Sequence, residues 1–196
     1  ERLRIEGSTG DILIHRFTTL FGNEGFRFFN NLSGGPQIQV SRISGDPILL
    51  NRNGTDGSIV EFRKSWGAGG SIHVGTNSAT YNTSSDYRLK ENVVPISDGI
   101  TRLKTLKPSR FNWIGDTNST RDGFLAHEVT AVPEAISGTK DEVYSEDEDG
   151  KNIKAGDPKY QGIDQSKLVP LLVAALQEAI TRIETLETKV TALEGS

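Results

Sequence analysis

A serine and a lysine stand five residues apart in the polar stretch SSDYRLKEN at 84–92, as Ser85 and Lys90. A neutral lysine amine can act as the general base for a hydroxyl nucleophile when burial disfavours its charged form. Such a pair could hydrolyse a peptide bond. Because this spacing is common by chance, its meaning depends on the elements around it.

Neighbouring residues could support that chemistry. Arg88 or backbone N–H groups are candidate donors to the oxyanion that develops when a carbonyl is attacked. His127 is also suited to proton transfer, although it could instead be a structural residue that hydrogen-bonds the chain near Ser85 and Lys90. Asp86 could assist too, and its alternative role is the N-cap of a short helix beginning there.

The chain is polar and has few apolar residues from which to build a core. Hydrophobic residues make up 34% of the 196 residues, where close to half is usual. Such a chain stays partly disordered or buries its apolar faces against copies of itself. The net charge is −4 without a basic patch, which argues against nucleic-acid binding. No apolar run approaches the length of a membrane span, so we expect no membrane insertion.

The sequence also gives no signal for a metal or a cofactor, and we expect none. There is no cysteine, which excludes disulfides and cysteine-based zinc sites, and the three histidines show no ligand spacing. A calcium loop is conceivable in the acidic region 139–158, but the ordered EF-hand spacing is missing, so we favour a solvated β-hairpin or mobile loop. The chain opens at Glu1, and we expect it to be a piece of a longer polypeptide.

Residues 1–84 have a pattern typical of fibrous β structure, with 13 of the 21 glycines and short alternating runs between turn residues. Each run has one or two inward apolar residues, too few for a self-sufficient core. Three chains around one axis would bury them, so we predict an interwoven, triple β-helix-like trimeric fibre for 1–85. The expected strands are Leu3–Ile5, Asp11–Ile14, Gln37–Val40, Ile48–Leu50, Ser58–Phe62 and Ser71–Val74.

An aromatic cluster interrupts this pattern, because five of the eight phenylalanines lie between residues 17 and 31. They could fill a local widening of the trimer core. Alternatively, they could form an exposed patch that contacts a host receptor or glycan. Trp66, beside a glycine-rich loop, is open to the same two interpretations. The five are Phe17, Phe21, Phe26, Phe28 and Phe29.

From residue 86 onward the pattern is that of a compact α+β domain. Apolar residues at 96, 100, 103 and 106 predict a short helix that ends before Pro108. Ser109–Trp113 alternates and predicts a strand, and 116–122 is expected to be a turn. Residues 123–126 are expected to form a buried strand or the entry from a strand into a helix.

A long amphipathic helix is predicted at about 164–194, with Pro170 in its first turn. Its apolar residues are spaced alternately by three and four, the heptad pattern of a coiled coil. The helix could instead pack this face on its own domain, but sustained repeats favour association between chains. The seam positions are Val169, Leu172, Leu176, Ala179, Ile183, Leu186, Val190 and Leu193.

Three blocks occur in order: SSDYRLKEN at 84–92, GFLAHEV at 123–129 with PEAI at 133–136, and YQGIDQSKLVPLLVAALQE at 160–178. Together they resemble the C-terminal intramolecular chaperone domain of phage tail spikes and tail fibres, the endosialidase-type self-cleaving serine peptidase. The resemblance implies a homotrimer that folds the fibre and then cuts itself off through a Ser–Lys dyad. Ser85 falls on the family's cleavage-site serine and Lys90 on its lysine.

The resemblance implies two parts, a distal fibre segment at 1–85 and a chaperone at 86–196, separated by a cut at Ser85–Asp86. It also implies a virion protein whose chaperone domain acts in the host cytoplasm during assembly. Attack by Ser85 on the preceding carbonyl, through a five-membered ring, would cut Ser84–Ser85 instead, so the exact bond stays open. Two competing hypotheses for the function are a trimeric fibre tip that never cuts itself and a receptor-binding module.

Overall fold

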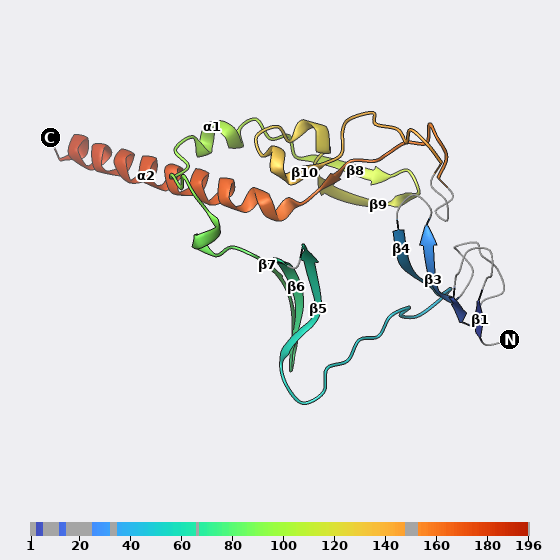
Figure 1. The fold of residues 1–196 in the computed structure, drawn as a ribbon. Coiled ribbons are helices and arrows are strands. Elements are labelled where there is room, and N and C mark those ends of the chain that lie inside the picture. Colours follow the sequence, from blue (N-terminus) through green and yellow to red (C-terminus); the bar gives the residue numbers. More distant parts are fainter. Residues whose placement is uncertain are drawn as a thin grey trace. The chain divides into compact units, whose positions relative to one another are not determined.

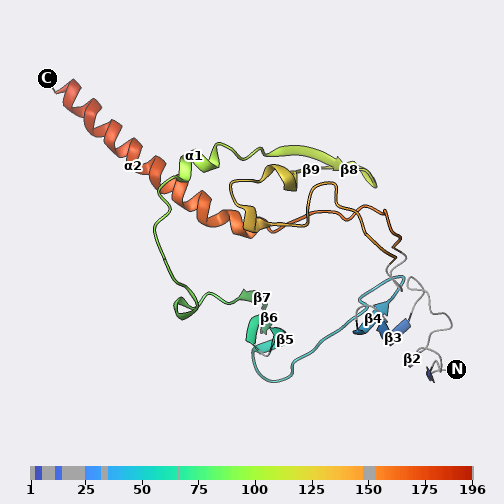
Figure 2. The ribbon, with the colours of Figure 1, turned by 45° about the horizontal axis from the view of Figure 1, so that its top comes forward.

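The structure is a computed structural model that describes residues 3–5, 12–14, 25–31, 35–65, 67–147 and 153–195. It combines β-sheets with a long C-terminal helix, an α+β chain (Figure 1). The residues divide into two compact units, Glu1–Val93 with Asp147–Ile153 and Val94–Glu146 with Lys154–Ser196. Figure 2 shows the same elements from a second direction.

The first unit contains a four-stranded antiparallel sheet in the order β1-β2-β3-β4. Strands expected at 3–5, 11–14 and 37–40 are confirmed, because each of these segments contributes to one of its strands. Phe17, Phe21 and Trp66 lie outside the described residues. The strands are β1 Leu3–Ile5, β2 Ile12–Ile14, β3 Gly25–Asn31 and β4 Gly35–Ser41.

A three-stranded antiparallel meander follows, formed by β5 Gly57–Lys64, β6 Gly67–Gly75 and β7 Ser78–Thr83. The strands expected at 58–62 and 71–74 are confirmed as parts of β5 and β6. The strand expected at Ile48–Leu50 is wrong, because these residues are exposed and form no strand. Pro47 lacks the N–H that a ladder requires, and turn formers follow at 51–54.

The first unit has little packed interior. Of its side chains whose burial the structure describes, none is fully buried, and β7 is exposed along its whole length. A two-stranded or three-stranded sheet without a covered apolar face is marginal in water. The three-stranded sheet of β5, β6 and β7 therefore needs another surface to pack against.

The second unit begins with the short helix α1, Gly99–Leu103, and a hairpin formed by β8, Ser109–Trp113, and β9, Asp116–Gly123. It ends with the 26-residue helix α2, Val169–Glu194. The strand predicted at 109–113 is confirmed as β8. The turn predicted at 116–122 is wrong, because these residues form β9. Its polar residues show no apolar alternation, yet they pair along β8, where Arg110 Nε lies 2.7 Å from Asp122 Oδ1.

Single-turn 3₁₀ helices and a small antiparallel pair connect these elements. The isolated bridge between Val143 and Pro158 joins the two arms of the acidic region, in agreement with the favoured hairpin. The connecting elements are η2 Ala126–Glu128, η3 Pro133–Ala135, β10 Ile136–Ser137, β11 Gly162–Ile163 and η4 Gln165–Leu168.

The core of the second unit joins two of the sequence blocks. One side comes from 129–135 and the other from the start of α2, with Phe124, Leu106 and Ile163 packed at its edge. Packing in the core therefore accounts for some of the apolar residues in the GFLAHEV, PEAI and 160–178 blocks. The buried cluster consists of Val129, Val132, Ala135, Leu168 and Leu171.

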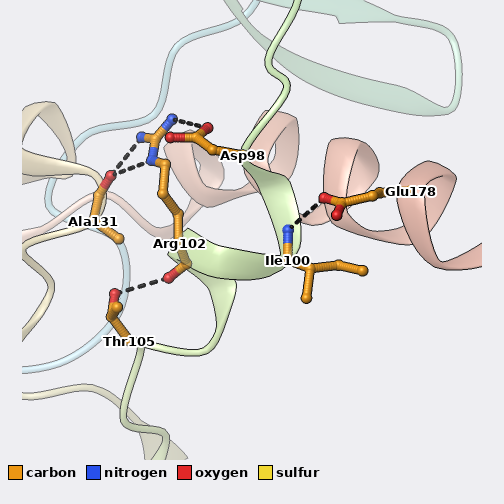
Figure 3. Close-up of polar contacts among 6 residues, drawn as sticks. All are labelled: Asp98, Ile100, Arg102, Thr105, Ala131 and Glu178. Carbon is orange, nitrogen blue, oxygen red and sulfur yellow. Dashed lines mark hydrogen bonds and ion pairs between the residues drawn. The ribbon is translucent and has the colours of Figure 1, made fainter.

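Helix α1 rests directly on the backbone of α2 through Gly99, where a Cβ atom would lie 2.6 Å from the backbone nitrogen of Ala175. The backbone N–H of Ile100 donates to Glu178 Oε2 at 3.0 Å, so a side chain of α2 caps α1 (Figure 3). Arg102 Nε donates to the carbonyl of Ala131 at 3.1 Å and ties α1 to the core segment.

Replacing Gly99 with alanine should destabilise the second unit by about 1–3 kcal/mol, because the added methyl group meets backbone that cannot rotate away. The matched control is Gly115→Ala in the β8–β9 turn, where the added methyl group has no atom within 4 Å. Urea unfolding of the two variants beside the parent chain measures the difference. Equal midpoints for Gly99→Ala and Gly115→Ala would contradict the close approach.

Helix α2 carries two apolar stripes. Leu168, at its start, with Leu171 and Ala175 faces its own unit and is buried. The heptad seam from Val169 to Leu193 lies on another stripe: Ala179 is partly buried and the other seven positions are exposed. Beyond Ile180 every described residue of the helix is exposed. The packing of α2 on its own unit therefore leaves most of the seam exposed.

Candidate functional site

A one-turn 3₁₀ helix shapes the junction that follows β7. This helix, η1, spans Tyr87–Leu89, and Asp86 is its N-cap, with Oδ1 accepting from the Arg88 backbone N–H at 2.9 Å. The N-cap role expected for Asp86 is thus confirmed. The turn closes when the Leu89 N–H donates to the Asp86 carbonyl and the Lys90 N–H donates to the Tyr87 carbonyl, both at 3.1 Å.

This turn brings together the serine and the lysine that the sequence singled out. Lys90 Nζ donates a hydrogen bond to Ser85 Oγ at 2.7 Å. The distance is within the range in which a proton can pass between a base and a nucleophile. Chemically, the arrangement can deprotonate a hydroxyl once the amine is neutral.

Both members of the pair are exposed in a single chain. Large apolar side chains beside them are exposed as well, with Tyr87 at 81% and Leu89 at 73%. Lysine side chains in water are protonated at neutral pH and cannot accept a proton. A surface that covers this segment would therefore be needed before Lys90 could act as a base.

Asp86 and Arg88 form a second pair in the same turn. Arg88 Nε donates to Asp86 Oδ1 at 2.9 Å and Nη2 donates to Oδ2 at 2.7 Å, a two-pronged ion pair. The hydrogen bonds from the Arg88 side chain and then from its backbone lower the pKa of the Asp86 carboxyl. The sequence pointed to each residue separately, and an Asp-x-Arg spacing across a tight turn was the available signal for their pairing.

His127 belongs to the other compact unit. It is exposed on η2 and lines a shallow pocket beside the acidic hairpin together with Lys140, Asp141 and Lys159. Its support of Ser85 and Lys90 stays a prediction. The capping of α1 by Glu178 had no sequence signal, because Glu178 lies outside the heptad seam and 78 residues from Ile100.

Two other kinds of site find no support in the described residues. Within the described ranges, no group of three or more metal-ligating side chains comes together. Over the same part of the chain, no helix combines the length and the apolar character that a bilayer crossing would require.

Residues 85–137 match the family model described as chaperone of endosialidase. This segment is similar to the endosialidase chaperone family. The matched range begins at Ser85 and includes the junction, the GFLAHEV block and PEAI, whereas the block at 160–178 lies beyond it. A comparison with curated protein sequences gives no significant match.

The family match indicates a chaperone role in the trimerisation and folding of phage tail proteins. The family is also classed among the peptidases, which indicates a self-cleaving activity. The endosialidase chaperone match thus confirms the resemblance carried by the first two blocks. It extends across Val93, where the first compact unit ends, into the core of the second.

Proposed function

We propose that this chain is the C-terminal region of a phage tail fibre or tail spike that folds as a homotrimer. Residues 86–196 act as an intramolecular chaperone for residues 1–85 and then leave by a single autoproteolytic cut beside Ser85. The observation that carries this proposal is the 2.7 Å hydrogen bond between Lys90 Nζ and Ser85 Oγ inside the family-matched segment.

In the proposed reaction, neutral Lys90 accepts a proton from the attacking group, directly or through the Ser85 hydroxyl, and returns it to the departing backbone amine. One water molecule is consumed for each bond cut, which leaves a new carboxylate and a new amine. Following the family pattern, the bond is Ser85–Asp86. Because attack by Ser85 on its own carbonyl needs a strained four-membered ring, the attacking group is the serine of a neighbouring chain or a water activated by the pair.

The trimer would supply the cover that the pair needs. The exposed apolar residues beside it, Tyr87, Leu89, Val93 and Val94, give another copy a surface to bury. Exclusion of water disfavours the ammonium form of a lysine. In this account the dyad becomes a working base only after the chains have assembled, so cutting follows folding.

Association of the chains is assigned to α2. Its heptad seam is exposed while a separate stripe packs on its own unit, which favours a coiled coil between chains over packing within one. Three α2 helices joined in a coiled coil would also hold the three fibre segments close together, at high effective concentration. The fibre segment then stays in the virion to meet a host receptor or glycan, and the chaperone acts in the host cytoplasm during assembly.

Residues 1–85 expressed without the rest of the chain should aggregate or stay unfolded, because their described side chains include no fully buried one. Sheets of this kind face loop-closure and registration costs before contacts compensate for them. The same segment released by cutting from the trimer should stay folded, since its unfolding is slow.

The measurement is circular dichroism with sedimentation, for residues 1–85 made alone and for the same segment released from full-length protein. If the two preparations form the same stable trimer, the chaperone role fails and residues 86–196 are only a tip. A folded released segment beside an unfolded separate one supports the proposal.

A further inference from the structure

The negative charge of the Asp86 carboxylate would hinder Lys90 from acting as the proposed base. Asp86 is the N-cap and Lys90 the C-cap of the one-turn helix η1, and a lysine beside a carboxylate favours its charged form. A charged Lys90 cannot take the Ser85 proton. The junction must therefore keep this carboxylate from pairing with the lysine.

Arg88 occupies both oxygens of that carboxylate. Oδ1 accepts from the backbone N–H and from Nε of Arg88, each at 2.9 Å, and Oδ2 accepts from Nη2 at 2.7 Å. A guanidinium matches a carboxylate with two parallel hydrogen bonds, which a lysine amine cannot do. Lys90 Nζ meanwhile bonds to Ser85 Oγ.

We propose that Arg88 is a positioning residue that holds the Asp86 carboxylate away from Lys90, so that the lysine amine stays on Ser85. This inference rests on the proposed self-cleavage. It differs from a role for Arg88 as oxyanion donor, because it acts through Asp86 and is dispensable once the Asp86 charge is gone. Glu91 is the other acidic residue of the stretch and is kept unchanged in the test.

The test compares Arg88→Ala, Asp86→Asn and the double variant with the parent chain, following the fraction of full-length chain cut over time. Asparagine keeps the N-cap and the shape of Asp86 and removes its charge. Arg88→Ala should cut at least about fivefold more slowly, because even an exposed ion pair between Asp86 and Lys90 would have an effect of this size. Asp86→Asn sets the reference rate for the double variant, which should recover to within about twofold of that reference.

The recovery is the deciding result, since a merely structural role of Arg88 would not be rescued by removing a second side chain. A double variant as slow as Arg88→Ala would overturn the proposal, because Arg88 would then act directly on the reacting atoms. Parent-like cutting by Arg88→Ala would overturn it too.

A second measurement does not depend on cleavage. In the full-length Ser85→Ala chain, acetylation of Lys90 by acetic anhydride is followed by peptide mass spectrometry. Adding Arg88→Ala should slow this acetylation several-fold, and adding Asp86→Asn as well should restore it, because only the neutral amine reacts. Unchanged labelling in both would overturn the role of Arg88. A parent chain that is never cut would count against the proposed function alone.

Discussion

Ser85→Ala and Lys90→Ala each abolish cutting at the junction and leave a folded, self-associated full-length chain. Serine supplies the nucleophile or positions the water, and lysine supplies the base, so loss of either should slow the reaction by at least about 10³-fold. Folding is spared because both side chains are exposed and neither belongs to the core of the second unit. Denaturing gels of purified protein, taken over days, measure the cut fraction.

Two matched variants separate chemistry from local disturbance. Ser84→Ala removes the neighbouring hydroxyl and should cut at nearly the parent rate. Lys90→Arg keeps the positive charge and the length of the side chain but cannot act as a base at neutral pH, so it should be inactive. Persistent cutting in purified Ser85→Ala would refute the dyad.

Aspartates at Ile183 and Leu186 should abolish both trimer formation and cutting. These seam residues are 54% and 59% exposed in a single chain, so the monomer tolerates the change. In a coiled coil the new carboxylates would be buried beside their copies, at a cost of several kcal/mol per site. Light scattering coupled to size exclusion measures the mass, and gels measure the cut fraction.

The control places the same charges on the same helix, at Thr185 and Thr188, which are exposed positions outside the seam. Thr185→Asp with Thr188→Asp should leave a trimer that cuts normally. A monomeric Ile183→Asp, Leu186→Asp variant that cuts efficiently would show that one chain contains the whole active site. That result would remove the link between assembly and cleavage.

The sequence predicted the elements whose residues repeat with a clear period. Helix α2 runs from Val169 to Glu194, with the 3₁₀ turn of η4 before it, close to the predicted 164–194. The alternating runs within β5 and β6 predicted these two strands equally well. In both cases a regular apolar pattern reports the local backbone directly.

Elements without such a pattern were not predicted correctly from the sequence. The polar strand β9 is held by pairing with β8 and was expected to be a turn, whereas Ile48–Leu50 is an apolar run that follows Pro47 and forms no strand. The contact of Gly99 with α2 joins residues 76 positions apart, at Ala175, and no local pattern announces it. Such tertiary contacts depend on packing that a one-dimensional pattern does not contain.

At the candidate site the sequence supplied the residues, and the structure supplied their relations. Ser85 and Lys90 were chosen from spacing and resemblance, and the turn of η1 explains how five residues close to 2.7 Å. The pairing of Asp86 with Arg88 was indicated only by their spacing, and the exposure of the whole segment could not be predicted from residue types. Both follow from the backbone path and from what surrounds the junction.

Intact-mass spectrometry of the purified chain beside Ser85→Ala tests self-cleavage most directly. The account predicts that the parent, a 21.4 kDa chain, yields two fragments whose masses sum to the full length plus one water. The C-terminal fragment should begin at Asp86 and contain 111 residues, or 112 if the bond is Ser84–Ser85. Ser85→Ala should give the full-length mass alone. A parent chain that keeps its full mass as an assembled trimer, or fragments that also form from Ser85→Ala, would contradict the account.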